Sequence, residues 1–209
     1  MHISFADTLR IKREAKKLGQ TFPEKSHSLL LSETAKQLFG LRNFHEFNKL
    51  RNKTIEQNIV RSGGFGSVAT CTFCGFGLFC PDVQEDKKTH LARHNAFEEA
   101  SGILNYTPAF HAQREINKRH GYSLLKETNP ETQINGALEI LRSWFDRSLE
   151  GAISNSYWKL HPKFEEYVSI MIGNAEHFSP RVAFLLERQY GRTDGIIQKG
   201  NSDWYPPKK

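Results

Sequence analysis

The chain has 209 residues, of which 38% are hydrophobic and 11% aromatic, which is enough apolar surface for a packed core. It contains no apolar run of about 18 residues, the length that a membrane-spanning helix needs, so we expect no membrane segment. Its three cysteines are an odd number, which disfavours a disulfide framework and favours a cytoplasmic protein that uses cysteine to bind a metal.

The net charge of +6 is concentrated in the first part of the chain. Residues 1–61 contain twelve Lys and Arg against six Asp and Glu, whereas residues 62–209 contain seventeen of each. Excess positive charge on one small module is typical of a protein that binds phosphates, because each Lys or Arg contact releases a counterion. A solvated helix surface can have the same composition, so both interpretations stay open.

Three helices are expected within this basic module. The first is capped by Ser4 and ends at Gly19, the second ends at Gly40, and the third follows with Arg51 on its solvent side. Two short helices that meet at a glycine, the second carrying Arg and Asn, favour a helix-turn-helix. We therefore expect the nucleic-acid-binding side chains to be Arg10, Lys12, Arg13, Lys16, Lys17, Arg42, Asn43, His45 and Lys49.

Residues 26–47 read "SHSLLLSETAKQLFGLRNFHEF". This stretch resembles a small helical module found at the front of some bacterial glyoxalase-related and mobile-element proteins. The resemblance covers about the first fifty residues. It implies the three helices and a bacterial or mobile-element context, and it implies no activity.

A cysteine pair and a histidine pair lie in the middle of the chain. Cys71 and Cys74 are followed directly by Gly75, so a tight turn can direct both thiolates at one ion while the glycine takes a positive φ. His90 and His94 are four residues apart, and on a helix their imidazoles share one face. This Cys-x2-Cys-x15-His-x3-His set resembles the two-Cys two-His zinc fingers. The resemblance implies a strand hairpin, a helix over about residues 82–101, and one structural zinc ion.

The ligand set has one alternative. Cys80 is either a small core residue or a third thiolate that replaces one histidine. Neither His-Glu-x-x-His nor His-x-Glu with a distant Cys-x-x-Cys occurs, and Glu98 and Glu99 are expected to face solvent. Four protein ligands leave no open position on the metal, so we expect no catalytic residues and no enzyme. A single finger would specify too few base pairs to select a DNA site by itself.

Helices are expected after the finger, and a proline is expected in the first turn of each. Pro108, Pro130, Pro162 and Pro180 follow residues that suit a helix start. The longest helix covers about residues 131–153. We expect the aromatic side chains of this part to pack in a core rather than to stack on bases.

The sequence thus predicts a mainly α protein with three parts. These are a basic three-helix head (residues 1–61), a zinc-bound ββα-like module (residues 67–101) and a helical bundle (residues 102–209), with a Gly- and Ser-rich linker at residues 61–67. The expected function is DNA binding, as in a transcription regulator from a bacterial or mobile-element context, with the bundle mediating self-association or partner contact. The alternative is a protein-binding or inhibitor protein in which zinc only stabilises the fold.

Overall fold

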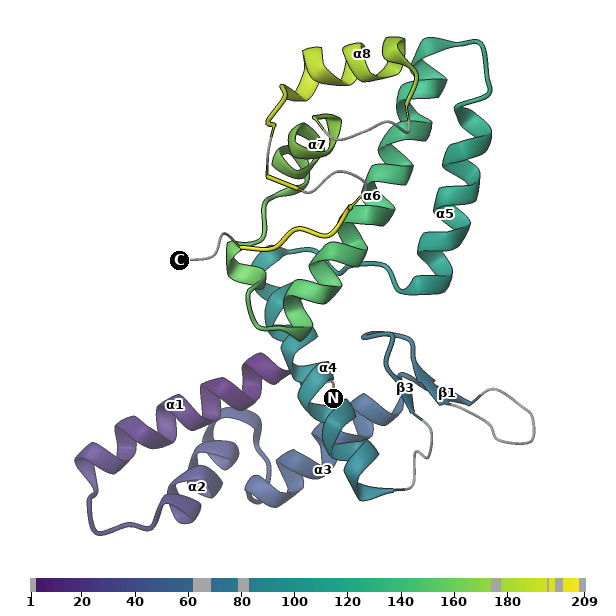
Figure 1. The fold of residues 1–209 in the computed structure, drawn as a ribbon. Coiled ribbons are helices and arrows are strands. Elements are labelled where there is room, and N and C mark those ends of the chain that lie inside the picture. The colour runs from purple at the N-terminus through teal and green to yellow at the C-terminus, as the bar shows by residue number, and fades with distance from the viewer. Residues whose placement is uncertain are drawn as a thin grey trace. The chain divides into compact units, whose positions relative to one another are not determined.

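The computed structural model describes residues 3–61, 69–78, 83–173, 178–194, 196–197 and 201–206 (Figure 1). Within these residues the chain forms eight α-helices, one short 3-10 helix and three short strands, which confirms the mainly α class. The chain divides into two compact units, Met1–Asn105 and Tyr106–Lys209. Within the described residues, no helix combines the length and the apolar character that crossing a bilayer requires.

The first unit begins with the three predicted helices: α1 (Phe5–Thr21), α2 (His27–Phe39) and α3 (Phe44–Glu56). Helix α1 packs against α2, and α2 packs against α3. Their shared core consists of Ile3, Ile11, Ala35, Leu41 and Phe47. Burial of one such large aliphatic side chain contributes about 1.5–3 kcal/mol to stability, so this core favours the packing of the three helices.

Local signals set most of the ends of these helices. Ser4 accepts a hydrogen bond from the backbone N–H of Asp7, and the Asp7 carboxylate accepts one from the Ser4 N–H, which is a capping box. Gly40 ends α2 with a φ of 68°. The predicted end of α1 at Gly19 is wrong, because the helix continues to Thr21. A Cβ at Gly19 would lie 3.3 Å from Cδ1 of Leu30, so this glycine lets α2 approach closely.

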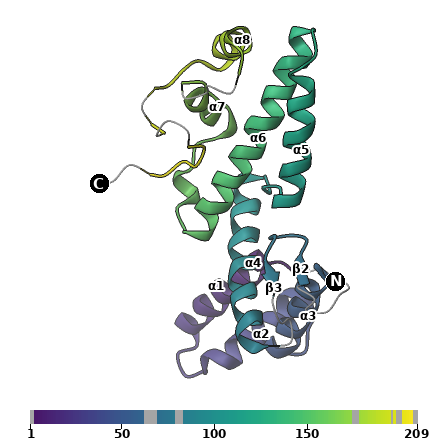
Figure 2. The same ribbon diagram turned by 45° about the vertical axis from the view of Figure 1, so that its right-hand side comes forward.

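A three-stranded antiparallel sheet and a long helix complete the first unit (Figure 2). Strands β1 (Ile59–Arg61), β2 (Ala69–Cys71) and β3 (Gly77–Leu78) lie in that order and precede α4 (Gln84–Leu104). Ile59 pairs with Cys71, and α1 packs against α4. The sequences assigned to the head and to the zinc module therefore fold into one unit. Of the predicted linker, only Arg61 is described.

The second unit contains α5 (His111–Leu124), α6 (Pro130–Ser154), a 3-10 helix η1 (Trp158–Leu160), α7 (Phe164–Ile172) and α8 (Pro180–Tyr190). Helices α5 and α6 lie side by side in both views (Figures 1 and 2). They approach closely at Gly121 and Gly136, where a Cβ on either glycine would lie 2.6 Å from the carbonyl oxygen of the other. Of the five aromatic residues predicted to pack in the core, Trp144, Trp158 and Tyr167 are buried, whereas Tyr157 and Phe164 are half-buried.

Two of the four predicted proline starts are confirmed, since Pro130 and Pro180 open α6 and α8 after the capping residues Asn129 and Ser179. The other two are wrong, because α5 begins three residues after Pro108 and α7 begins two residues after Pro162. Near Pro108 the backbone has another partner. The N–H of Ala109 donates to the buried carboxylate of Asp146 on α6 at 3.1 Å, which holds this residue outside the helix.

Candidate metal centre

The four predicted ligands converge at one point in the first unit. Cys71, Cys74, His90 and His94 are all buried, and their ligand atoms lie within 4.8 Å of one another. Sulfur and nitrogen atoms about 2.0–2.3 Å from a tetrahedral zinc would be about 3.3–3.8 Å apart. Sγ of Cys71 and Nδ1 of His94 are separated by 3.4 Å, so this pair is already at the spacing that one shared ion requires.

A tight turn between β2 and β3 positions the two thiols. Cys71 is the last residue of β2, and its carbonyl oxygen accepts a hydrogen bond of 2.9 Å from the N–H of Gly75. The N–H of Cys71 in turn donates to the carbonyl of Phe76 at 3.0 Å. Gly75 has a φ of 67°, which confirms the predicted positive-φ position and explains why a residue without Cβ follows Cys74.

Helix α4 positions the two imidazoles one turn apart, as predicted. The ring of His90 stacks on Phe76 with centroids 5.9 Å apart, and the ring of His94 lies 4.8 Å from that of Phe73. These aromatic rings shield the cluster from water. The buried Nε2 of His90 has no hydrogen-bond partner within the described residues. Coordination of an ion by this imidazole would satisfy the unpaired nitrogen. The residues present therefore fit a metal ion with two sulfur and two nitrogen ligands.

The alternative ligand, Cys80, lies outside the described residues. Its participation stays a prediction. The four converging side chains supply four ligand atoms without it, and a metal bound by all four would have no open position for a substrate or a water.

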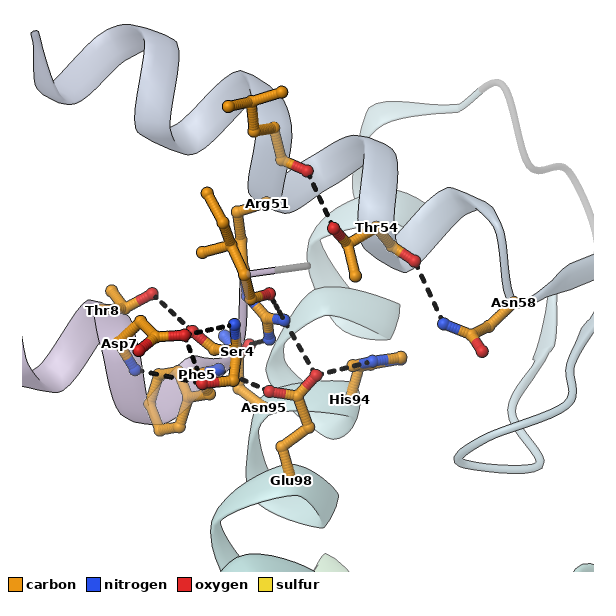
Figure 3. A network of polar contacts seen from close by, with 12 residues as sticks. Ser4, Phe5, Asp7, Thr8, Arg51, Thr54, Asn58, His94, Asn95 and Glu98 are labelled. Atoms are coloured by element: carbon orange, nitrogen blue, oxygen red, sulfur yellow. Dashed lines mark hydrogen bonds and ion pairs between the residues drawn. The ribbon is translucent and has the colours of Figure 1, made fainter. Parts of the chain in front are cut away.

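A carboxylate beside the metal centre orients one of the imidazoles. Nε2 of His94 lies 3.2 Å from Oε1 of Glu98, one turn further along α4 (Figure 3). With its Nδ1 facing Cys71, His94 can donate from Nε2 to this carboxylate, and such a contact fixes the tautomer and the ring orientation of a metal ligand. Glu98 was expected to face solvent, and that expectation is wrong: its side chain is only 14% exposed.

The partner of Glu98 is an arginine from the basic head. Nη1 of Arg51 on α3 donates to Oε1 of Glu98 at 2.8 Å and to the carbonyl of Ile3 at 2.9 Å, while Nη2 donates to Oδ1 of Asn95 at 2.8 Å. The expectation that Arg51 faces solvent is wrong, since it is 4% exposed. The sequence holds a signal for this burial, because Arg51 is four residues from both Phe47 and Ile55 and thus shares their apolar face.

The same carboxylate also reaches helix α1. Oε2 of Glu98 accepts a hydrogen bond from the backbone N–H of Phe5, the first residue of α1 after the cap Ser4 (Figure 3). Free N–H groups at a helix start favour a negative partner. A continuous chain of contacts therefore runs from the metal ligand His94 through Glu98 to Arg51 and to the start of α1.

Local charges set the protonation of these groups in the absence of a metal. Burial disfavours the charged form of Glu98, but hydrogen bonds from His94 and Arg51 outweigh it and lower the pKa of Glu98 to about 2. The hydrogen bond from Cys74 lowers the pKa of Cys71, and the same contact raises the pKa of Cys74. The two thiols thus share one proton, which a divalent cation would displace on binding.

The predicted nucleic-acid-binding residues lie on α1, on α3 and in the turn before α3, all in the same unit. The five on α1 (Arg10, Lys12, Arg13, Lys16 and Lys17) are exposed, as are Arg42, His45 and Lys49. Asn43 has a structural role, because its Oδ1 accepts from the N–H of Glu46 at 2.9 Å and caps α3. Glu14 pairs with Lys17 at 2.9 Å and with Arg13 at 3.5 Å, which offsets part of the charge on α1.

A serine and a histidine meet in the second unit, a combination that also occurs in hydrolases. Oγ of Ser148 lies 2.8 Å from Nε2 of His161. Ser148 is buried, and its Oγ also accepts from the N–H of Trp204 at 2.9 Å. This pair therefore anchors the C-terminal segment to α6.

The chain matches no protein-family model, no curated protein and no solved structure. The resemblances to the two-Cys two-His fingers and to the glyoxalase-related module therefore rest on the residues quoted above.

Proposed function

We propose that the protein binds DNA and that the ion at the four-ligand cluster is a structural zinc. A set of two thiolates and two imidazoles binds zinc in preference to harder cations such as magnesium and calcium. The observation that carries the DNA-binding proposal is the row of exposed cations on α1, where five of the eight residues from Arg10 to Lys17 are Lys or Arg.

The arrangement of these cations suits a phosphate backbone. Arg10, Arg13 and Lys17 follow the i, i+3, i+7 spacing of one helix face, while Ile11 and Ala15 face the core. Contacts of this kind give affinity and orientation without sequence information. The start of α3 would then read the bases, in the manner of a helix-turn-helix, with Arg42 and His45 exposed there. We propose that the protein is a regulator from a bacterial or mobile-element context, in which α1 contacts the DNA backbone and the start of α3 contacts the bases.

The metal centre supports this role indirectly. Phe5 at the start of α1 and Arg51 on α3 both contact Glu98, which in turn contacts the metal ligand His94. A bound ion would fix His94, and through it the carboxylate that joins these two helices. Zinc would thereby set the relative positions of the two helices that carry the basic side chains.

A second candidate is binding to a protein, with zinc only stabilising the fold. The observation that favours it is that several large apolar side chains of the same unit are exposed, among them Leu9, Phe22 and Leu29. Self-association or partner binding through the C-terminal helices stays a prediction.

The first test is DNA binding by the full-length protein as a function of salt concentration. We expect it to shift random duplex DNA at low salt, with a log-log slope of about −0.9 per phosphate neutralised. Replacing Arg13, Lys16 and Lys17 by Ala should weaken binding to all sequences alike and flatten the slope by up to about 2.7, because three phosphate contacts are lost.

A control with the same change of charge is available in the second unit. Lys126, Arg181 and Arg188 are exposed, and their replacement by Ala should leave the slope unchanged. Equal weakening by the two triple variants would show that α1 is not the contact surface. Failure of the native protein to shift any duplex at low salt would remove the DNA proposal and favour the protein partner.

A further inference from the structure

A cavity of about 670 Å³ lies beside the metal centre in the first unit. Its walls come from α3, β1, β3 and α4, and its size is within the range of about 300–1,000 Å³ that is usual for small-ligand sites. Four aliphatic residues, Ile55, Ile59, Leu78 and Leu91, form its apolar surface. Such a surface favours an occupant with a flat or apolar part.

The polar side chains at this cavity are mainly cationic or amide groups. Lys87 and Lys88, in the first turns of α4, line it and are exposed, and Arg61 at the end of β1 lines it as well. Glu56 is the acidic residue among the described lining residues. The lining therefore has an excess of positive charge, which favours an anionic occupant.

Two amide side chains and the imidazole of the candidate ligand His90 complete the polar lining among the described residues. Asn52 on α3 and Gln84 at the start of α4 are both exposed and both line the cavity. An amide offers donors and an acceptor together, which is the combination that pairs with the edge of a nucleobase. The cavity thus offers an apolar surface for the face of a base, amides for its edge, and lysines for the phosphate of a nucleotide.

We propose that this cavity binds one unpaired nucleotide of a nucleic-acid strand. The base lies against the aliphatic surface, the amides of Asn52 and Gln84 contact its edge, and Lys87 and Lys88 bind the adjacent phosphates. The inference rests on the proposed nucleic-acid binding and adds to it, because α1 would contact the backbone of paired DNA whereas this cavity admits only an unpaired base. A run of acidic side chains would satisfy the lysines but offers no flat apolar group to cover the aliphatic surface formed by Ile55, Ile59, Leu78 and Leu91.

The test uses the full-length protein loaded with zinc and a fluorescein-labelled single strand of six thymidylates, with binding followed by anisotropy. Two variants address the two halves of the site. Lys87→Gln with Lys88→Gln removes the phosphate contacts, and Asn52→Leu removes an amide that contacts the edge of the base without adding an aromatic ring. The matched control is Lys36→Gln with Lys53→Gln, since both lysines are exposed and neither lines the cavity. Zinc content and a thermal unfolding curve verify that each variant is folded.

We expect Asn52→Leu to weaken binding of the single strand by about tenfold, which is within the range for the loss of one contact to a base edge, the double lysine variant to weaken it by a similar factor, and the control to change it by less than about twofold. The double lysine variant should also flatten the salt slope by about 0.7 per lost phosphate contact. A strand of the same length without bases should bind to the native protein at least as weakly as the six-thymidylate strand binds to Asn52→Leu.

Three results would overturn the inference: native-like binding of the single strand by both cavity variants, equal binding of the strand without bases, or equal binding of a hexaglutamate peptide. Duplex DNA separates this inference from the proposed function. If duplex binding depends on Arg13, Lys16 and Lys17 while the single strand does not bind, only the cavity assignment fails. If neither nucleic acid binds at low salt, both proposals fail.

Discussion

Replacement of Cys74 by Ser should remove the metal from the protein and unfold the sheet and the first turns of α4. Three ligands remain, and the buried cluster then contains a hydroxyl that binds the ion far more weakly than a thiolate. The apparent binding energy of a structural zinc is about 10–16 kcal/mol at neutral pH, which is comparable to the whole stability of a typical domain at about 5–15 kcal/mol. Metal content by elemental analysis and amide exchange of residues 69–78 and 83–104 measure the two effects.

The control for this experiment is the third cysteine. Cys80→Ser should retain one metal ion per chain and native exchange rates if the ligands are Cys71, Cys74, His90 and His94. His94→Ala should lose the metal. If Cys80→Ser empties the site and His94→Ala does not, the ligand set is wrong.

Replacement of Arg51 by Met should destabilise the first unit by about 3–5 kcal/mol. The change keeps the length of the buried side chain but leaves the carboxylate of Glu98 without its cation, and an uncompensated buried charge costs about this much. Urea unfolding measures the loss. Arg42→Met is the control, because Arg42 is exposed and surface substitutions change stability by about 0.5 kcal/mol or less.

A double-mutant cycle tests whether the loss arises from the pair. Arg51→Met with Glu98→Gln should recover much of the stability, since no buried charge remains. Glu98→Gln alone should weaken metal binding by about 10–100-fold, because His94 loses the carboxylate that orients it. An Arg51→Met protein as stable as Arg42→Met would contradict the buried network.

The features predicted correctly from the sequence are those that short stretches of chain determine. Ser4 and Asp7 form their capping box within four residues, Gly40 ends α2 through its own φ, and Gly75 serves the turn that its neighbour Cys74 needs. The histidine pair shares a helix face because of helical periodicity. In each case the residues that interact are neighbours in the sequence, so their pattern is visible without the fold.

The features missed depend on contacts between distant residues. Arg51 and Glu98 are 47 positions apart, and although Arg51 shares the apolar face of Phe47 and Ile55, neither helix by itself shows which residue is the partner. Strand β1 has only three residues, too few for a recognisable alternation, and it is defined by its pairing with β2. The buried ion pair joins two segments that are far apart in the sequence, so the pattern of neither segment alone predicts it.

X-ray absorption at the zinc edge of the purified full-length protein tests the central claim most directly, because it reports both the metal and its ligand atoms. We predict one zinc ion per chain with two sulfur neighbours at about 2.3 Å and two nitrogen neighbours at about 2.0–2.1 Å. A shell of three sulfurs and one nitrogen would show that Cys80 replaces a histidine, and protein that takes up no zinc would contradict the account of this cluster as a metal centre.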